Sequence, residues 1–237
     1  MNLRVIYTLL CCLLACCLAA QNLKDDSSFV QQAFNNADQE SRHALGYHPP
    51  WVNGRSNSPY PFGFSIGTPY WGNGLFEKGK LWYEGLEYVD IPLLLDELAG
   101  KLIANTGQGA LELISTKVDA FTINGRQFTN IKNSETLTGF YEIVYAGSSM
   151  VVKRTHKKLL EKAVEGLGLV REIEKKTLYY YKKGGNYIAI KNKSSLLNAL
   201  GSYTAELEKL IKSKRLSWKK DPDGLISEVV SRYDQLI

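Results

Sequence analysis

The chain has no cysteine beyond residue 17 of its 237 residues. Its four cysteines all lie within the first twenty residues: Cys11, Cys12, Cys16 and Cys17. A domain formed by the later residues therefore has no disulfide and depends on its apolar core for stability. Histidine is scarce as well. The nearest approach to a set of metal ligands is Glu40, His43 and His48, and it lacks the spacing of a zinc site. We predict no metal and no other cofactor.

The start of the chain has the order of a secretory signal peptide, which we place at residues 1–20. A charged beginning, MNLR, precedes the apolar run VIYTLLCCLLACCLAA, which ends in small residues. The run is shorter than the roughly 18 to 25 residues expected of a membrane span. Two processing routes stay open: cleavage before Gln21, or a lipoprotein route in which LLAC makes Cys16 the acylated first residue. Cleavage is favoured because LAAQN is a good site, so we predict an exported protein, periplasmic or secreted.

Basic residues are concentrated in one part of the chain. Residues 151–220 carry a large excess of Lys and Arg, whereas residues 21–150 carry a small excess of Asp and Glu. Such a region is typical of proteins that contact an anionic membrane surface, and also of sheets and helices whose lysines are simply solvated, which is the favoured interpretation. Because the chain is predicted to be exported, we predict no nucleic acid as a partner.

Residues 21–76 predict a short helix followed by an irregular arm. Apolar residues from Phe29 to Ala37 recur at helical spacing behind Ser28. From His48 to Gly74 the chain has five of its seven prolines, which excludes a continuing helix or a central strand. The aromatic residues of this arm are too many for a purely solvated linker, so we expect it to lie against the domain.

Residues 77–192 predict an antiparallel sheet. Short β-rich runs flank Asn124-Gly125 and, further on, Gly184-Gly185, as in tight hairpins. The connections are too short for crossover helices, so an antiparallel meander is expected rather than parallel pairing. Residues 193–236 then change to helical periodicity. The predicted fold is α+β: an antiparallel, curved meander sheet, with a partial barrel as its more closed form, and C-terminal amphipathic helices packed on it in a single domain of residues 77–237.

Aromatic residues on one predicted strand, and aromatic and basic residues in the segment KSKRLSWKK, are candidate binding surfaces. The tyrosines could form a platform for sugar rings, but we favour a strand covered by helices on one side and by the arm on the other. The basic segment would contact an anionic surface, although the end of a helix followed by a charged loop explains the same lysines. The candidate binding residues are Tyr179, Tyr181, Tyr187, Trp218, Lys219 and Lys220.

One catalytic motif occurs, GFSIG at residues 63–67, which would make Ser65 a nucleophile. That motif requires a strand, a strained turn and a helix, and the prolines around Ser65 exclude the helix. His156 is the one histidine that follows it, in a lysine-rich segment. Asp96 and Glu97 are adjacent and point to opposite faces of a strand, so a turn role is favoured over an acid and base pair. We predict no catalytic residue, and a noncatalytic protein rather than an enzyme.

Several segments, in their order, are familiar: QESRHALGY, GTPYW, GKLWYEGLEYVDIPLLLDELAGKLI, GFYEIVYAG and LYYYKKGGNYIAIKNKSSLLNAL. Together they resemble a family of exported, functionally uncharacterised, single-domain β-rich proteins of Gram-negative bacteria. The resemblance implies export and a mostly β fold, and it brings no active site.

Three functions follow from these patterns, in order of preference. The first is an exported noncatalytic envelope or secreted protein that binds or assembles a macromolecular partner. The second is a carrier that holds a lipid or another apolar ligand in a cavity between the curved sheet and the helices. The third is a serine hydrolase that uses Ser65.

Overall fold

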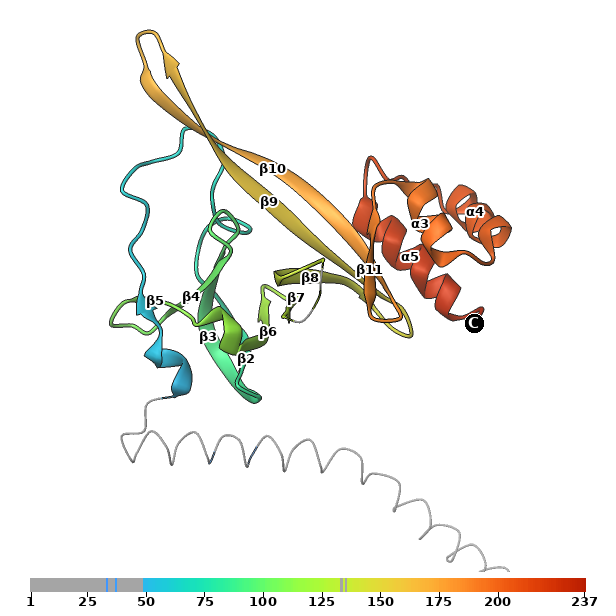
Figure 1. Ribbon diagram of the computed structural model, residues 1–237, viewed down its shortest axis with the longest axis horizontal. Helices are drawn as coiled ribbons and strands as arrows, with labels where there is room; N and C mark the ends of the chain where they lie inside the picture. The colour runs from blue at the N-terminus through green and yellow to red at the C-terminus, as the bar shows by residue number, and fades with distance from the viewer. Residues whose placement is uncertain (1–32, 34–36, 38–48, 133, 135) are drawn as a thin grey trace, which may run out of the picture. The chain divides into compact units, whose positions relative to one another are not determined.

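The computed structural model describes residues 33, 37, 49–132, 134 and 136–237. The chain divides into two units, Met1–Pro50 and Trp51–Ile237, and the second contains the sheet and the C-terminal helices (Figure 1). The predicted signal peptide lies outside the described residues, as do Glu40, His43, His48 and most of the predicted helix behind Ser28. None of the helices in the described part combines the length and the apolar character that a membrane span needs.

The second unit is built on one antiparallel sheet of eleven strands in the order β1-β5-β4-β3-β2-β6-β7-β8-β9-β10-β11. This confirms the predicted α+β class and the antiparallel pairing. With β1 and β11 as its edges, the sheet stays open in the described part of the chain. The strands are β1 Arg55–Ser56, β2 Glu77–Tyr83, β3 Leu86–Asp96, β4 Lys101–Asn105, β5 Ala110–Glu112, β6 Val118–Ile123, β7 Arg126–Ile131, β8 Gly139–Ala146, β9 Met150–Val164, β10 Gly168–Lys183 and β11 Asn186–Ile190.

The sheet consists of two meanders that join where β2 pairs with β6. It is therefore not a single meander in which the strands follow their order in the sequence. After β5 the chain returns through the short helix η3, Ser115–Lys117, and β6 pairs with β2 so that Leu81 faces Phe121. The side-chain amide of Asn130 donates hydrogen bonds to the carbonyls of Ser115, 2.7 Å, and Val118, 2.9 Å, and so holds the return in place.

Both predicted hairpins are confirmed. Asn124 and Gly125 connect β6 to β7, and Gly184 and Gly185 connect β10 to β11. All four residues have positive φ angles, between 47° and 91°. Two positive φ angles in a two-residue loop match the right-handed twist of the flanking strands, which explains why asparagine and glycine occur there.

The β9–β10 hairpin is much longer than its neighbours. β8 pairs with β9 only as far as Lys153, and β11 pairs with β10 only from Tyr179 onward. We call residues 154–178, which continue beyond both neighbours, the distal ribbon (Figure 1). Its strands pair with each other up to Val164 and Gly168 at the turn.

Three helices follow the sheet: α3 Lys193–Leu200, α4 Thr204–Ser213 and α5 Pro222–Asp234. Asn192 and Ser195 form a capping box at the start of α3, and the side chain of Asp221 accepts from the amide of Gly224 at the start of α5. The helices cover the near end of β9 and β10 and form a helix core, the buried cluster of Val151, Tyr179, Tyr181, Leu196, Leu197, Leu207, Leu225, Ile226, Val229 and Val230.

A second buried cluster, the sheet core, lies on strands β2 to β8. Its central rings are Phe121 and Phe128, stacked at 4.7 Å, with Phe140 edge-on to Phe121 at 5.3 Å. The other large members are Leu81, Tyr83, Leu93, Leu95, Leu102 and Ile123.

The arm after residue 49 is ordered and belongs to the domain. Trp51, in the short helix η2 (Pro50–Asn53), is buried in the sheet core, and β1 adds an edge strand to β5 ahead of the predicted start of the sheet at residue 77. Further on, the amide of Trp71 donates to the carbonyl of Leu95 at 2.8 Å. The arm is therefore packed on the domain, as expected.

Candidate functional site

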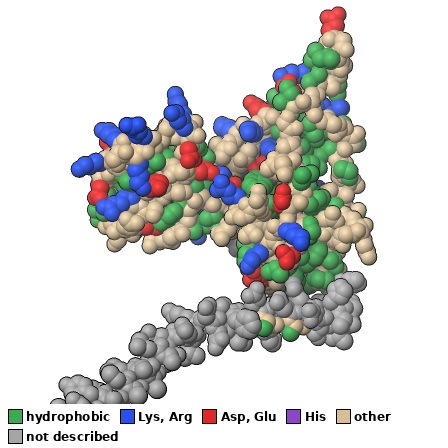
Figure 2. Space-filling view, turned by 180° about the vertical axis from the view of Figure 1, so that it is seen from behind, with side chains coloured by type: hydrophobic (Ala, Val, Ile, Leu, Met, Phe, Trp, Pro, Cys, Tyr) green, Lys and Arg blue, Asp and Glu red, His purple; other side chains and the backbone are tan. Residues whose placement is uncertain are grey.

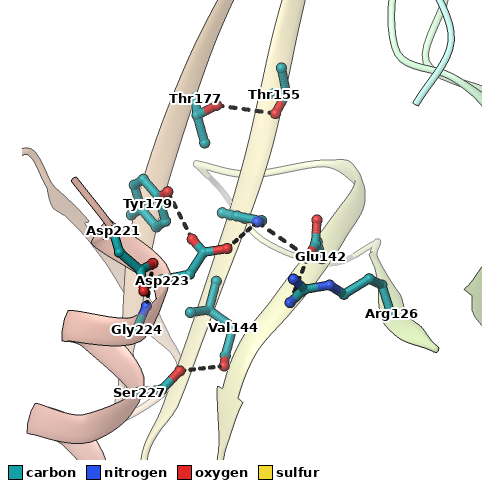
Figure 3. Close-up of polar contacts among 11 residues, drawn as sticks. Arg126, Glu142, Val144, Thr155, Thr177, Tyr179, Asp221, Asp223, Gly224 and Ser227 are labelled. Carbon is teal, nitrogen blue, oxygen red and sulfur yellow. Dashed lines mark hydrogen bonds and ion pairs between the residues drawn. The ribbon is translucent and has the colours of Figure 1, made fainter. Parts of the chain in front are cut away.

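A row of charged side chains separates the two cores. Glu142 on β8 lies between Phe140, in the sheet core, and Val144, which packs on the helix core. The ammonium group of Lys153 on β9 lies 3.2 Å from a Glu142 carboxylate oxygen and 2.5 Å from an Asp223 oxygen on α5 (Figure 3). We call this row, together with the Lys157–Glu97 pair described below, the polar seam.

Two further groups complete the Lys153 end of the seam. The hydroxyl of Tyr179 donates to the second carboxylate oxygen of Asp223 at 2.9 Å, and Arg126 lies 3.7 Å from Glu142 (Figure 3). Burial and this hydrogen bond to Asp223 raise the pKa of the Tyr179 hydroxyl, which therefore stays protonated as a donor.

The other end of the seam is a buried ion pair. Lys157 and Glu97 have side chains that are 7% and 10% exposed, and their charged groups lie 2.9 Å apart. Lys157 also donates to the carbonyls of Thr68, at 3.0 Å, and Tyr70, at 2.5 Å, in the arm. All three N–H groups of the lysine thus have acceptors. Burial raises the pKa of Glu97, and the charge and hydrogen bond of Lys157 oppose that rise.

Both faces of β9 are covered at its start, since Val151 and Val152 are both fully buried. Lys153 and Lys157 share the face of Val151. On that face they meet carboxylates from β8, from α5 and from the turn after β3, which explains why they are buried. The sequence favours solvated faces for the lysines of this region, and the structure instead places these two inside. Alternation alone does not identify them, because neither face of the strand is wholly exposed.

The polar seam lies between the two cores but does not form a ligand site. A pocket between Glu97, Glu142 and Lys153 has a volume of about 20 Å³, enough for roughly one water molecule. Small-molecule sites are typically roughly 300 to 1,000 Å³. The carboxylates of Glu97, Glu142 and Asp223 all pair with lysine, so none is a free base. In the described part of the chain no group of three or more His, Cys, Asp or Glu side chains is arranged for a metal.

The predicted tyrosine platform is divided between two faces of the sheet. Tyr179 and Tyr181 are buried in the helix core, at 7% and 6% exposure. Tyr187 is paired with Lys182 and so shares the opposite face with Tyr180, where both pack on a third cluster near Tyr141. The helices cover one side, as the favoured interpretation expected, and this third cluster, rather than the arm, meets Tyr180 on the other.

The predicted basic segment is partly buried and partly exposed. The ring of Trp218 packs edge-on against Tyr179 at 5.4 Å and contacts the helix core. Lys219 and Lys220 are exposed. The structure therefore brings Trp218 and Tyr179 together as a packing pair and leaves the two lysines at the surface.

Ser65 lies in an extended part of the arm beside β10. Its amide donates to the carbonyl of Arg171 at 2.8 Å. His156 is paired with Lys176, five residues along the strand from Arg171, or about 16 Å away. Burial, with the charges of Arg154 and Lys176, lowers the pKa of His156. This geometry gives the serine-hydrolase alternative no support.

Asp96 has the turn role that the sequence favours. One of its carboxylate oxygens accepts from the amide of Ala99 at 2.8 Å, which closes the turn after β3. The other oxygen accepts from the hydroxyl of Tyr60 at 2.8 Å and ties the arm to the sheet. Glu97 points instead to Lys157, so the two carboxylates have separate partners.

The tip of the distal ribbon is a surface that the sequence analysis did not identify. Val164, Leu167 and Leu169 are 37%, 75% and 50% exposed around the turn. Figure 2 shows hydrophobic side chains near the end of the projecting ribbon. The signal was present in the segment AVEGLGLV, where aliphatic residues alternate with turn-forming glycines. The residues of the polar seam, in contrast with the tip, include no exposed aliphatic side chain.

The contact layer between the sheet and the helices is filled. Side chains such as Val151, Leu207 and Ile226 are fully buried there, so the carrier hypothesis gains no support from this layer. Comparisons of the chain with protein-family models, with curated proteins and with solved structures find no match. The suspected family and the predicted export stay predictions, and the surfaces that the fold exposes are the guide to function.

Proposed function

We propose that this chain is an exported, noncatalytic protein that binds, or helps to assemble, a macromolecular partner through the tip of the distal ribbon. The observation that carries the proposal is the exposure of Val164, Leu167 and Leu169 together at the end of a projecting hairpin. Exposed aliphatic side chains in water are unfavourable, and a partner that encloses the tip and covers them gains about 25 cal/mol for each Å² of apolar surface removed from water.

The shape of the tip favours a large partner over a small ligand. A hairpin turn is convex, so the partner has to supply the concave surface, which a macromolecule can do. The turn is held by a hydrogen bond from the amide of Leu167 to the carbonyl of Val164, 3.1 Å. Behind it, cross-strand ion pairs join Arg171 to Glu161 at 2.7 Å and Lys162 to Glu172 at 2.8 Å. Such a braced tip loses little conformational entropy on binding.

The test is site-specific photocrosslinking in intact cells, with the photoreactive residue placed at position 167 or, as a control, at position 75. Leu75 is the matched control because it is an equally apolar residue, 64% exposed, outside the ribbon. We expect one discrete adduct from position 167 that is absent from position 75 and that disappears in a Leu169→Ser background. The same adducts from both positions, or an adduct indifferent to Leu169→Ser, would contradict the proposal.

A further inference from the structure

A cluster of five exposed cations lies on α4 and on the loop that leads to α5. We call it the basic surface: Lys209, Lys212, Arg215, Lys219 and Lys220. On the opposite side of α4, Leu207 and Ile211 are buried in the helix core. Figure 2 shows Lys and Arg side chains gathered over this helical end. Within the described residues, the side chains of these five cations form no ion pair.

Most of the neighbouring carboxylates are paired with other cations. Glu206 binds Arg232, Glu208 lies 3.9 Å from Lys193, and Glu228 lies 2.6 Å from Lys214. Asp221, which adjoins Lys220, accepts from the amide of Gly224 at 2.9 Å as the cap of α5. The basic surface therefore has five cations close to one carboxylate without an ion pair, an excess of positive charge that favours an anionic partner.

The helix dipole does not explain the cluster either. It favours a cation such as Lys212 in the last turn of α4. Lys219 and Lys220, however, directly precede Asp221 at the start of α5, where the dipole presents its positive end. Cations at a helix start are mildly unfavourable, so the dipole does not account for these two lysines.

Arg215 follows the end of α4, and its side chain is exposed. Its φ is 53°, which closes the helix: the amides of Arg215 and Leu216 donate to the carbonyls of Lys212, 3.2 Å, and Ile211, 3.0 Å. Its guanidinium has no hydrogen bond, ion pair or ring contact among the described residues, so its charge is left at the surface with the other four cations.

The aromatic residue of this region argues for a phosphate surface over a nucleic acid or a sugar. Both of the latter are commonly held by stacking on an exposed ring. The ring of Trp218 is partly buried, with an edge contact to Tyr179 and packing on the helix core, so it is not a fully exposed stacking platform. What remains at the surface is a convex helix with flexible cations, which suits a flat anionic layer.

We propose that the basic surface binds an anionic phospholipid bilayer. The inference is independent of the function proposed for the tip, because the helices lie at the opposite end of the β9–β10 hairpin (Figure 1).

The test is co-sedimentation of the full chain with phosphatidylglycerol-containing vesicles and with pure phosphatidylcholine vesicles. The variant is Lys212→Gln/Lys219→Gln/Lys220→Gln. The matched control is Lys158→Gln/Lys175→Gln/Lys176→Gln, which removes the same charge from exposed positions on the distal ribbon.

We expect salt-sensitive binding to the anionic vesicles alone and a loss on the order of 100-fold in the basic-surface variant. The control variant should keep most of the binding. No binding by the unmodified chain, or equal losses in both variants, would overturn the proposal. Tighter binding to heparin or duplex DNA than to the vesicles, lost in the same variant, would also overturn it in favour of another polyanion. Leu167→Ser should leave vesicle binding unchanged, so failure here and failure of the tip proposal are distinguishable.

Discussion

Replacing Lys157 with methionine tests the polar seam most directly. The substitution keeps an unbranched side chain one atom shorter, but removes the charge that pairs with Glu97 and the donors that reach Thr68 and Tyr70. Removing one partner of a buried ion pair typically costs about 3 to 5 kcal/mol. We therefore expect Lys157→Met to lower the free energy of unfolding by about that amount at pH 7.

The pH dependence makes this prediction specific. Burial raises the pKa of Glu97 above its ordinary 4.5, so its stabilising contribution is complete below that value and is lost as the pH rises through the folded-state pKa. Without Lys157 the folded-state pKa of Glu97 rises further, so the variant continues to lose stability over a wider range of pH. Near pH 4 the deficit of the variant should shrink to about 1 to 2 kcal/mol, the cost of the hydrogen bonds to Thr68 and Tyr70.

Urea unfolding at the two pH values measures both quantities. Lys158→Met is the control, since Lys158 is exposed on the other face of β9 and should change stability by less than about 0.5 kcal/mol. Glu97→Gln/Lys157→Met should regain most of the loss at pH 7 because no unpaired charge stays buried. A deficit for Lys157→Met below about 1 kcal/mol at pH 7, or one equal at both pH values, would refute the account of the seam.

Three further changes probe other parts of the fold. Hydrogen bonds from Ser149 and Tyr145 outweigh the effect of burial and hold the pKa of Asp234 below its ordinary 3.8. The contribution of Asp234 to stability is therefore present above that pH and is lost as the pH falls through the folded-state pKa. Calorimetry should show that Asp234→Asn lowers Tm at pH 7 and lowers it less at pH 3. Gly79→Ala would place a Cβ 1.8 Å from the carbonyl oxygen of Thr122 and should lower the free energy of unfolding by about 3 kcal/mol or more. Gly63→Ala is the control, because a Cβ there meets open space. Equal urea midpoints for the two variants would exclude the close approach at Gly79. Phe121→Ala should cost about 3 to 5 kcal/mol in urea unfolding, and a loss below about 1 kcal/mol would show that its ring is not central to the sheet core.

The local turns were predictable because their chemistry is local. Asn124-Gly125 and Gly184-Gly185 supply the positive φ angles of their loops, and Asp221 before Pro222 marks the start of α5. Each signal lies within a few residues of the structure that it determines.

Pairing between distant segments could not be read in the same way. The return of β6 to β2 depends on Asn130 reaching the carbonyls of Ser115 and Val118, and a single side-chain amide gives no pattern in the sequence. The strand β1 is two residues long, too short for any alternation. Lys153 and Lys157 were expected on a solvated face because they are charged. The carboxylates that pair with them, those of Glu142, Asp223 and Glu97, lie on other elements and are distant in the sequence.

The arm connects the seam to the proposed binding tip. A two-stranded ribbon is marginally stable by itself, and the distal ribbon extends beyond its neighbours. The arm contacts the ribbon there through an isolated bridge between Ile66 and Glu172. The amide of Ile173 donates to the carbonyl of Ile66 at 2.9 Å, and the Arg171 guanidinium lies 4.3 Å from the centre of the Phe62 ring. Lys157 holds the same arm two residues beyond Ile66, at the carbonyl of Thr68.

Removing Lys157 should therefore weaken partner binding without altering any residue of the tip. In Lys157→Met we expect faster amide hydrogen exchange in residues 65–70 and 171–173 and a weaker crosslink from position 167, measured at a temperature where the variant is still folded. Lys158→Met should change neither. If the crosslink stays at full strength while exchange in these segments rises, the ribbon holds its conformation without the arm, and the arm serves the core alone.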